Sequence, residues 1–193
     1  ANPDFFIAHA DVEMIRAQRA PVKGVDQAPN GFQRMTEKFR LLPQVTIGQI
    51  EGRAGGGGCE LLFSLDMRFA AIGRAVLSQP EVALGILPGG GGTQRLPRLV
   101  GRSRAMEIIL GCQDFDAELA ERYGHVNRAL PADELEAFVD QLAFQIGRFS
   151  PTAIANAKAS VNAVDAGLTE ALALENHHFD KTVESDDAQK LMS

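Results

Sequence analysis

The apolar residues in the front half of the chain fall in short runs, whereas those in the back half recur with the spacing of a helix. Short apolar runs bounded by turn residues are typical of buried strands. They predict strands at 4–8, at 45–50 running into Gly52, at 68–72, at 75–77 and near Val126. Two stretches of the front half have helical spacing instead, and they predict helices at 11–20 and 28–41 with a loop between them.

The back half reads mostly as helix. Its apolar spacing predicts helices at 102–110, 116–123, 133–148, 151–165 and 168–184. Asp114 and Asp116 precede the second of these helices, and we expect them to cap it. Strands followed by helices predict an α/β or α+β protein with a helical C-terminal layer.

Composition narrows the class of protein. The chain has 193 residues, a net charge of −6, 45% hydrophobic and 23% charged residues. This is the profile of a soluble globular protein, and the length favours one domain over two. The acidic balance argues against a general nucleic-acid binder. No apolar run approaches the ~20 residues of a membrane span. Cys59 and Cys112 form no CxxC pair, so we expect a reducing compartment and no disulfide framework.

Two glycine runs interrupt this pattern, at 55–58 and 89–92. Flexible linkers lie among polar residues, but both of these runs are flanked by apolar strand and helix patterns. The spacings of nucleotide-binding glycine loops are absent, because Glu60 stands where the third glycine of Gly-x-Gly-x-x-Gly would fall. The remaining interpretation is a cradle for an anion at a helix N-terminus, such as the oxyanion of an acyl group.

Two glutamates lie near these runs in apolar surroundings. Glu60 lies two residues after the first run, and Glu81, in Gln79-Pro80-Glu81, lies seven residues before the Pro88 that opens the second. An apolar setting raises the pKa of a carboxyl group, which suits acid–base catalysis. The alternative is an ordinary solvated glutamate. Their separation is too long for one helix face, so only the fold can bring them together.

Other candidates for chemistry are weaker. His177 and His178 with Glu175 would suggest a metal site, but no third ligand has useful spacing, and a solvated helix is favoured. Cys59 has no histidine near it in sequence, so a buried structural thiol is favoured over a nucleophile.

Several stretches of the sequence resemble the motifs of a known protein family. They comprise 52–61, Asp66, 79–81, 84–96, 100–102 and 105–107. With them, the chain from about residue 4 to its end resembles the enoyl-CoA hydratase/isomerase (crotonase) superfamily, and within it the enoyl-CoA hydratases.

This resemblance implies a fold and an assembly. The family fold is a spiral of ββα turns, followed by C-terminal helices that mediate trimers, often paired into hexamers. We therefore expect a partial spiral core with the acyl-CoA site at 1–130 and a helical oligomerisation region at 131–193. Family members carry further strands before the segment that matches Phe5-Phe6, so N-terminal strands of the core are expected to be missing here.

The resemblance also implies roles for individual residues. The peptide N–H groups of Ala10 and Gly57 would form an oxyanion hole for the thioester oxygen. Glu60 would orient and activate water, and Glu81 would exchange a proton with Cα. The positions expected to contact the substrate are Ala8, Asp11, Pro80, Leu84 and Gly89.

The implied reaction is the reversible syn addition of water to trans-2-enoyl-CoA, which gives a 3-hydroxyacyl-CoA. Coenzyme A belongs to the substrate, so no separate cofactor or metal is expected, and neither is a nucleic-acid or membrane partner. The presence of both glutamates favours a hydratase over an isomerase or thioester hydrolase of the same family. A catalytically silent acyl-CoA-binding or assembly protein is the alternative from another class. Bacterial cytoplasm is the expected location, with a mitochondrial one open.

The acyl pocket of the family is shaped by the segment near 12–42. Phe32, Met35 and Phe39 are candidates to line it here, and ordinary core packing explains them equally well.

Overall fold

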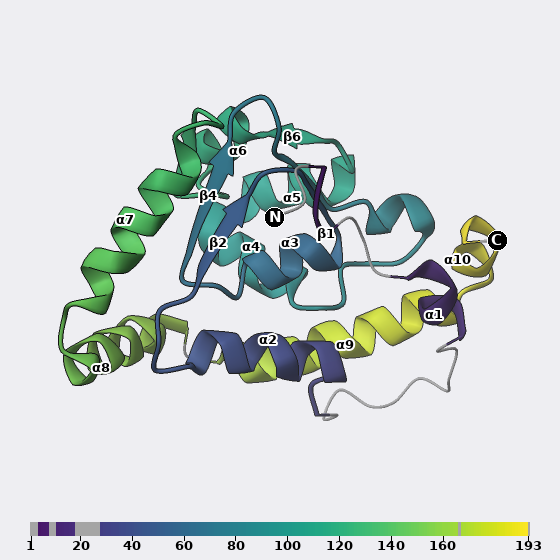
Figure 1. Cartoon of the computed structure of the whole chain (residues 1–193). Coiled ribbons are helices and arrows are strands. Elements are labelled where there is room, and N and C mark those ends of the chain that lie inside the picture. The colour runs from purple at the N-terminus through teal and green to yellow at the C-terminus, as the bar shows by residue number, and fades with distance from the viewer. Residues whose placement is uncertain (1–3, 8–10, 18–27, 166, 193) are drawn as a thin grey trace.

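The computed structural model describes residues 4–7, 11–17, 28–165 and 167–192, and it is an α/β structure with two small sheets (Figure 1). The first sheet has the strand order β1-β3-β5-β6, and the second has the order β2-β4-β7. The first is built from β1 (Phe5–Ile7), β3 (Arg53–Gly55), β5 (Val76–Ser78) and β6 (Phe115–Asp116). The second is built from β2 (Ile47–Ile50), β4 (Met67–Ala71) and β7 (Arg128–Leu130).

The chain visits the two sheets in turn, as a spiral does. β2 lies in the second sheet and β3 in the first, and the helix α3 (Gly57–Leu62) then leads back to β4. β4 and β5 repeat this alternation. Each turn therefore lays a strand beside the corresponding strand of the previous turn, which explains why β2 pairs parallel with β4 and β3 pairs parallel with β5.

The segment after β5 leads into the helical half of the chain. It contains a 3₁₀ turn, η1 (Glu81–Leu84), and the helices α4 (Gly92–Val100), α5 (Arg102–Gly111) and α6 (Ala117–Tyr123). The side chains that pack between these helices and the first sheet form the main hydrophobic core, centred on Leu62, Leu77, Leu96 and Ile108. Burial of such side chains is the main stabilising contribution to the fold.

Four later helices and a 3₁₀ turn surround this core. They are α7 (Leu135–Gly147), α8 (Pro151–Asn162), η2 (Ala163–Asp165), α9 (Leu168–Glu184) and α10 (Asp186–Leu191). α7 packs on the second sheet through a core that includes Phe69, Leu135 and Val139. α9 runs beneath the sheets beside α2 (Gly31–Leu41), and its far end meets α10 and α1 (Val12–Ala17) (Figure 1). In the described parts of the chain, no helix combines the length and the apolar character that crossing a membrane requires.

The expected α/β class and helical C-terminal region are confirmed, as are most of the helices and the strands at 4–8, 68–72 and 75–77. Several elements were not predicted, among them β3, η1, α4, β6 and α10. The strand expected near Val126 was misplaced, because Val126 lies in the turn before β7.

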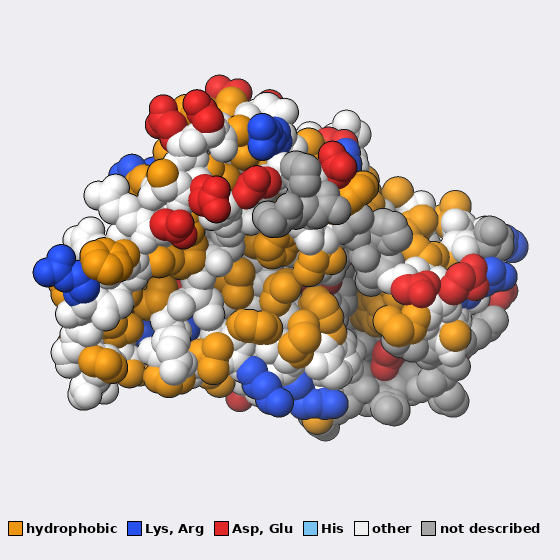
Figure 2. Space-filling model, viewed as in Figure 1, with side chains coloured by type: hydrophobic (Ala, Val, Ile, Leu, Met, Phe, Trp, Pro, Cys, Tyr) orange, Lys and Arg blue, Asp and Glu red, His pale blue; other side chains and the backbone are white. Residues whose placement is uncertain are grey.

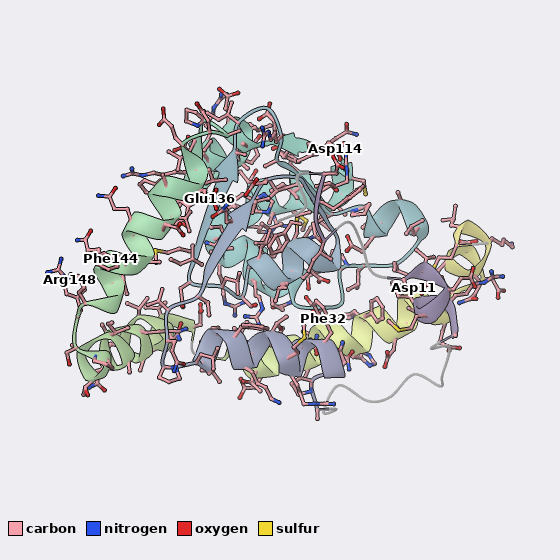
Figure 3. All side chains as sticks on the ribbon, viewed as in Figure 1. Asp11, Phe32, Asp114, Glu136, Phe144 and Arg148 are labelled. Atoms are coloured by element: carbon pink, nitrogen blue, oxygen red, sulfur yellow. The ribbon has the colours of Figure 1, made fainter. Side chains whose placement is uncertain are left out.

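Only one of the two predicted caps of α6 is correct. The Asp116 side chain accepts a hydrogen bond from the Leu119 N–H and caps the helix. Asp114 lies further out, where its carboxylate accepts two hydrogen bonds from the Arg53 guanidinium, at 2.8 and 2.7 Å. Asp114 therefore links the loop before β6 to β3 and does not cap α6; Figure 3 shows it at the edge of the molecule, far from Phe32.

Candidate active site

A cavity of about 330 Å³ opens where segments from both ends of the chain meet. α1, α2 and α9 provide apolar side chains to its wall, and the start of α3, η1 and the loop before α4 provide backbone and carboxyl groups. The lining residues are Val12, Met14, Ile15, Asn30, Gly31, Phe32, Gly56, Gly57, Glu60, Pro80, Glu81, Leu84, Ile86, Gly89, Gly90 and Phe179. Such a pocket, mostly apolar with a few converging polar groups, is typical of a small-molecule site.

The first glycine run forms the turn from β3 into α3. Gly55 ends the strand, and Gly56 turns the chain with φ = 51°. A Cβ atom on Gly56 would lie 2.6 Å from Oε1 of Glu81, so glycine is required both by the backbone angle and by the close approach of this carboxyl group. Gly57 is the first residue of α3 and lines the cavity, and N–H groups at this position have no acceptor within the helix.

Glu60 is held by the second glycine run. Its side chain is 4% exposed, and Oε1 accepts hydrogen bonds from the N–H groups of Gly90 and Gly92, at 2.7 and 2.8 Å. Burial raises the pKa of Glu60 well above its usual value, and the negative charges of Glu81 and Glu175 raise it further. The two N–H donors act in the opposite direction, because they stabilise the ionised form.

Glu81 lies at the start of η1 and faces the same cavity. Its side chain is 9% exposed, and Oε2 has no hydrogen-bond partner among the described residues. Burial raises the pKa of Glu81 to about 7, and the charge of Glu175 contributes to the rise. Glu81 therefore retains a proton near neutral pH more readily than an exposed glutamate.

The fold thus brings together the two glutamates that the sequence singled out. Both are buried, both line one cavity, and the negative charge of Glu81 raises the pKa of Glu60. Two close carboxyl groups resist ionising together, so one proton is favoured between them. Such a pair can supply one acid and one base on the same cavity.

Glu175 is the buried residue beside this site that the sequence interpretation missed. The prediction of a solvated helix is wrong at this position, because Glu175 is 1% exposed and faces inward from α9. Its Oε2 accepts hydrogen bonds from the N–H and the hydroxyl of Thr93, and its Oε1 accepts one from Nε2 of Gln33 at 3.1 Å. Both oxygens are therefore engaged by α4 and α2. The polar run 175–178 gave no sign of which residue faces inward.

The other predicted positions fall in three groups. Pro80, Leu84 and Gly89, which the sequence predicts to contact the substrate, line the cavity. Asp11 does not line it; its exposed carboxylate accepts hydrogen bonds from the N–H groups at the start of α1, and Figure 3 shows it beside that helix. Ala8 and Ala10 lie outside the described residues.

One of the three candidates for the acyl pocket lines the cavity. Phe32 of α2 does so, whereas Met35 and Phe39 are not among the lining residues. The remaining apolar wall comes from elsewhere: Val12 and Ile15 on α1, and Phe179 on α9. These side chains suit a hydrocarbon chain better than a charged ligand.

Cys59 behaves as the buried structural thiol that was favoured. It is fully buried, and its Sγ donates a hydrogen bond to the carbonyl of Ala54 at 3.0 Å. Burial raises the pKa of this thiol far above its usual value, so the nucleophilic thiolate is disfavoured.

Known proteins resemble the whole chain. The family model described as enoyl-CoA hydratase/isomerase matches residues 1–193. The short-chain-enoyl-CoA hydratase of Clostridium acetobutylicum is 34% identical over 194 residues, which cover 100% of this chain and 73% of the relative. Two crystal structures have the same architecture. One, of a candidate enoyl-CoA hydratase from Streptomyces avermitilis, is 39% identical with a TM-score of 0.88, covering 99% of this chain and 69% of that one. The other, of an enoyl-CoA hydratase from Bacillus anthracis, is 34% identical with a TM-score of 0.75, covering 96% and 71%.

Proposed function

This chain belongs to the enoyl-CoA hydratase/isomerase family, and on that premise we propose that it is an enoyl-CoA hydratase. The reaction is the reversible syn addition of water to a trans-2-enoyl-CoA. The observation that carries the proposal is the pair of buried carboxyl groups, Glu60 and Glu81, on one largely apolar cavity. Addition of water needs both a base for the water and an acid for the carbon next to the thioester.

In the proposed reaction Glu60 and Glu81 each move one proton. Glu60, ionised, takes a proton from water while the water oxygen forms a bond to C3 of the enoyl group. The electron pair of the C2=C3 bond moves toward the thioester and leaves negative charge on its carbonyl oxygen. Glu81 then gives its proton to C2, and the carbonyl is restored. The product is a 3-hydroxyacyl-CoA, and the two glutamates have exchanged protonation states.

The division of roles follows from the hydrogen bonds. Glu60 accepts two peptide N–H groups, which favour its ionised form, whereas Oε2 of Glu81 accepts none from the described residues. Burial raises the pKa of both groups and that of Glu60 strongly, so the placement of the single proton rests on the hydrogen bonds, and we place it on Glu81 before water adds. That arrangement matches Glu60 as base and Glu81 as acid.

The developing oxyanion needs donors, and we assign this role to the N–H groups of Gly57 and Ala10. Gly57 supports the assignment by its place at the start of α3, on the wall of the cavity that also holds both glutamates. The dipole of α3 favours negative charge at that end. A donor aimed at such an oxygen contributes about 3–4 kcal/mol to transition-state stabilisation. Pro80, Leu84 and Gly89 would contact the bound thioester.

The test is hydration of crotonyl-CoA, followed by loss of the enone absorbance, in the wild type and in Glu60→Gln and Glu81→Gln variants. The matched control is Glu136→Gln, an exposed glutamate on α7 that does not line the cavity and that Figure 3 shows well apart from the lining residue Phe32. We expect each site variant to lose at least about 100-fold in kcat/KM, and the control to retain it.

The other outcomes separate the alternatives. Migration of the double bond in a 3-enoyl-CoA without hydration would indicate an isomerase, and release of free thiol from an acyl-CoA would indicate a thioester hydrolase. Thermal stabilisation by CoA without turnover would indicate a silent binding protein. Full hydration activity in either site variant would contradict the role assigned to that glutamate.

We also propose a homotrimeric or hexameric assembly. The support is a set of apolar side chains exposed on α7, on α8 and at the ends of these helices, among them Phe144 at 71%, Phe149 at 55% and Val161 at 68%. Figure 2 shows hydrophobic side chains spread over the part of the surface where α7, α8 and α2 lie. Exposed apolar side chains gathered in one region of a surface favour an interaction site there. Light scattering on the purified chain would test the assembly, and a monomer at micromolar concentration would contradict it.

A further inference from the structure

The buried polar contacts around Glu175 connect three distant segments of the chain. Gln33 belongs to α2, Thr93 to the first turn of α4, and Glu175 to the middle of α9. Gln33 and Glu175 are buried, and Thr93 is half-buried. We call Gln33, Thr93 and Glu175 the Glu175 cluster. It is the only set of side chains described here through which α2, α4 and α9 all meet by hydrogen bonds.

The Glu175 cluster holds both ends of the second glycine loop. At one end, Glu175 accepts from the N–H and hydroxyl of Thr93, the N–H bond measuring 2.9 Å. At the other end, Nε2 of Gln33 donates to the carbonyl of Gly89 at 3.2 Å, and Nδ2 of Asn30 donates to the same carbonyl at 3.0 Å. Between these fixed ends lie Gly90 and Gly92, whose N–H groups hold Glu60.

We propose that Glu175 is a positioning residue, which fixes the Gly89–Thr93 loop so that the N–H groups of Gly90 and Gly92 orient the Glu60 carboxylate. Glu175 does not line the cavity and acts through the loop. The kinetic consequence rests on the proposed hydratase function, whereas the structural consequence does not.

The position requires a carboxylate, because three donors converge on it. The Thr93 N–H, the Thr93 hydroxyl and the Gln33 amide all donate, and a carboxylate only accepts. An amide at position 175 would satisfy the donors on one side and set its own NH₂ group against a donor on the other. The first turn of α4 donates one N–H group to Glu60 and one to Glu175. The N-terminus of this helix also favours the negative charge of both carboxylates.

The kinetic test compares Glu175→Gln with a matched change on the same helix, Glu170→Gln, whose side chain is exposed. A second pair separates the effect of the Thr93 hydroxyl from that of the side-chain size. Thr93→Val keeps the size and removes the hydroxyl donor, whereas Thr93→Ser keeps the donor in a smaller side chain. We expect Glu175→Gln and Thr93→Val to lower kcat by about 10- to 100-fold with KM changed less than about threefold, because misplaced catalytic groups slow the chemical step. Glu170→Gln and Thr93→Ser should stay within about twofold of the wild type.

Hydrogen exchange of the loop amides gives a readout that does not need activity. We expect the peptide covering 88–95 to exchange at least about 10-fold faster in Glu175→Gln and Thr93→Val, and unchanged in the two controls. Loop exchange and kcat both unchanged in folded Glu175→Gln would overturn the inference. So would a loss of kcat shared equally by Thr93→Ser, because the hydroxyl donor would then be irrelevant.

These two measurements also separate the inference from the proposed function. A wild type that does not hydrate crotonyl-CoA would overturn the proposed function, while faster exchange in the variants would still support the positioning role. A wild type that hydrates crotonyl-CoA, with loop exchange and kcat unchanged in Glu175→Gln, would leave the proposed function standing and overturn the role of Glu175.

Discussion

Glu60 and Glu175 are held by neighbouring peptide N–H groups of one helix turn, Gly92 donating to Glu60 at 2.8 Å and Thr93 donating to Glu175 at 2.9 Å. One carboxylate comes from α3 and the other from α9, so the start of α4 joins a residue of the front half of the chain to one near its end. Any displacement of this turn changes both carboxylates at once.

We expect Gly90→Ala to impair the site more than the fold. A Cβ atom on Gly90 would lie 2.5 Å from Oε2 of Glu60 and 2.6 Å from Cδ1 of Phe32, so the carboxylate must move away from its two donors. The predicted loss in kcat/KM is about 10- to 100-fold, with about 1–3 kcal/mol of lost stability. Steady-state kinetics and urea unfolding of the same preparation measure both.

Gly147→Ala is the matched control for this change. Gly147 ends α7, and a Cβ there meets no atom within 4 Å. Its kcat/KM should equal that of the wild type. A Gly90→Ala protein as active as the Gly147→Ala protein would contradict the close packing of the loop against Glu60.

The activity should decline as the pH rises above about 7. The active form of the glutamate pair carries one proton, which belongs on Glu81, whose pKa burial raises to about 7. Below that pKa Glu81 remains protonated and able to act as the acid, and above it kcat/KM should fall by about tenfold per pH unit. At acid pH kcat/KM should fall again, because the base Glu60, whose pKa burial also raises, becomes protonated. Crotonyl-CoA hydration measured from pH 5.5 to 9 gives this profile. A rate that stays flat to pH 9 would show that loss of the Glu81 proton does not limit the reaction.

His125 should make the folded state less stable in acid. The ring is fully buried against Phe63, and neither nitrogen has a hydrogen-bond partner among the described residues. Burial, helped by the charge of Arg68, lowers its pKa from 6.5 to about 3. Above pH 6.5 the ring is neutral in both the folded and the unfolded state, so His125 adds no pH dependence to the stability. Between pH 6.5 and 3 the unfolded chain binds a proton at His125 and the folded chain does not. This residue should therefore remove up to about 1.4 kcal/mol of stability per pH unit between 6.5 and 3.

The measurement is the free energy of unfolding of the wild type and His125→Leu at several pH values from 7.5 to 4.5. The difference between the two curves should grow in favour of His125→Leu as the pH falls. Parallel curves would mean that His125 does not titrate differently in the folded and unfolded states.

Two ion pairs of similar length should differ strongly in their contribution to stability. Lys158 and Asp66 are mostly buried and 2.7 Å apart, and the same Asp66 oxygen accepts hydrogen bonds from the N–H and hydroxyl of Thr46. Arg53 and Asp114 are also 2.7 Å apart, but their side chains are 39% and 54% exposed. Lys158→Met should cost about 3–5 kcal/mol because it leaves a buried carboxylate unpaired, whereas Asp114→Asn should cost no more than about 1 kcal/mol. Urea unfolding of both variants measures this, and equal costs would contradict the difference in burial.

The sequence allowed the two carboxyl groups of the site to be predicted because each lies beside a glycine-rich turn in an apolar stretch. Glu60 and Glu81 showed this local signal, and the resemblance to a family linked them. The helices at 151–165 and 168–184 were predicted because their apolar spacing extends over many turns.

The sequence interpretation failed where contacts between residues far apart in the sequence determine the structure. Glu175 stands in a polar run, and only the passage of α9 across the start of α4 buries it. β3 has three residues, one of them a glycine, and it is a strand because β1 and β5 pair with it on either side. Asp114 is of a residue type that commonly caps helices and stands shortly before α6, but Arg53, 61 residues earlier, binds it. Local pattern carries no information on such partners.

The position of α9 has a consequence for the order in which the molecule becomes functional during synthesis. A chain released from the ribosome as far as β7 already holds the strands of both sheets, as well as Glu60 and Glu81. The glycine loop would still lack Glu175, and the cavity would lack Phe179, until α9 docks. The nascent protein would therefore be able to form both sheets before its candidate active site is complete. A chain that stalls before α9 would lack the contacts of Glu175 and Phe179 at that site.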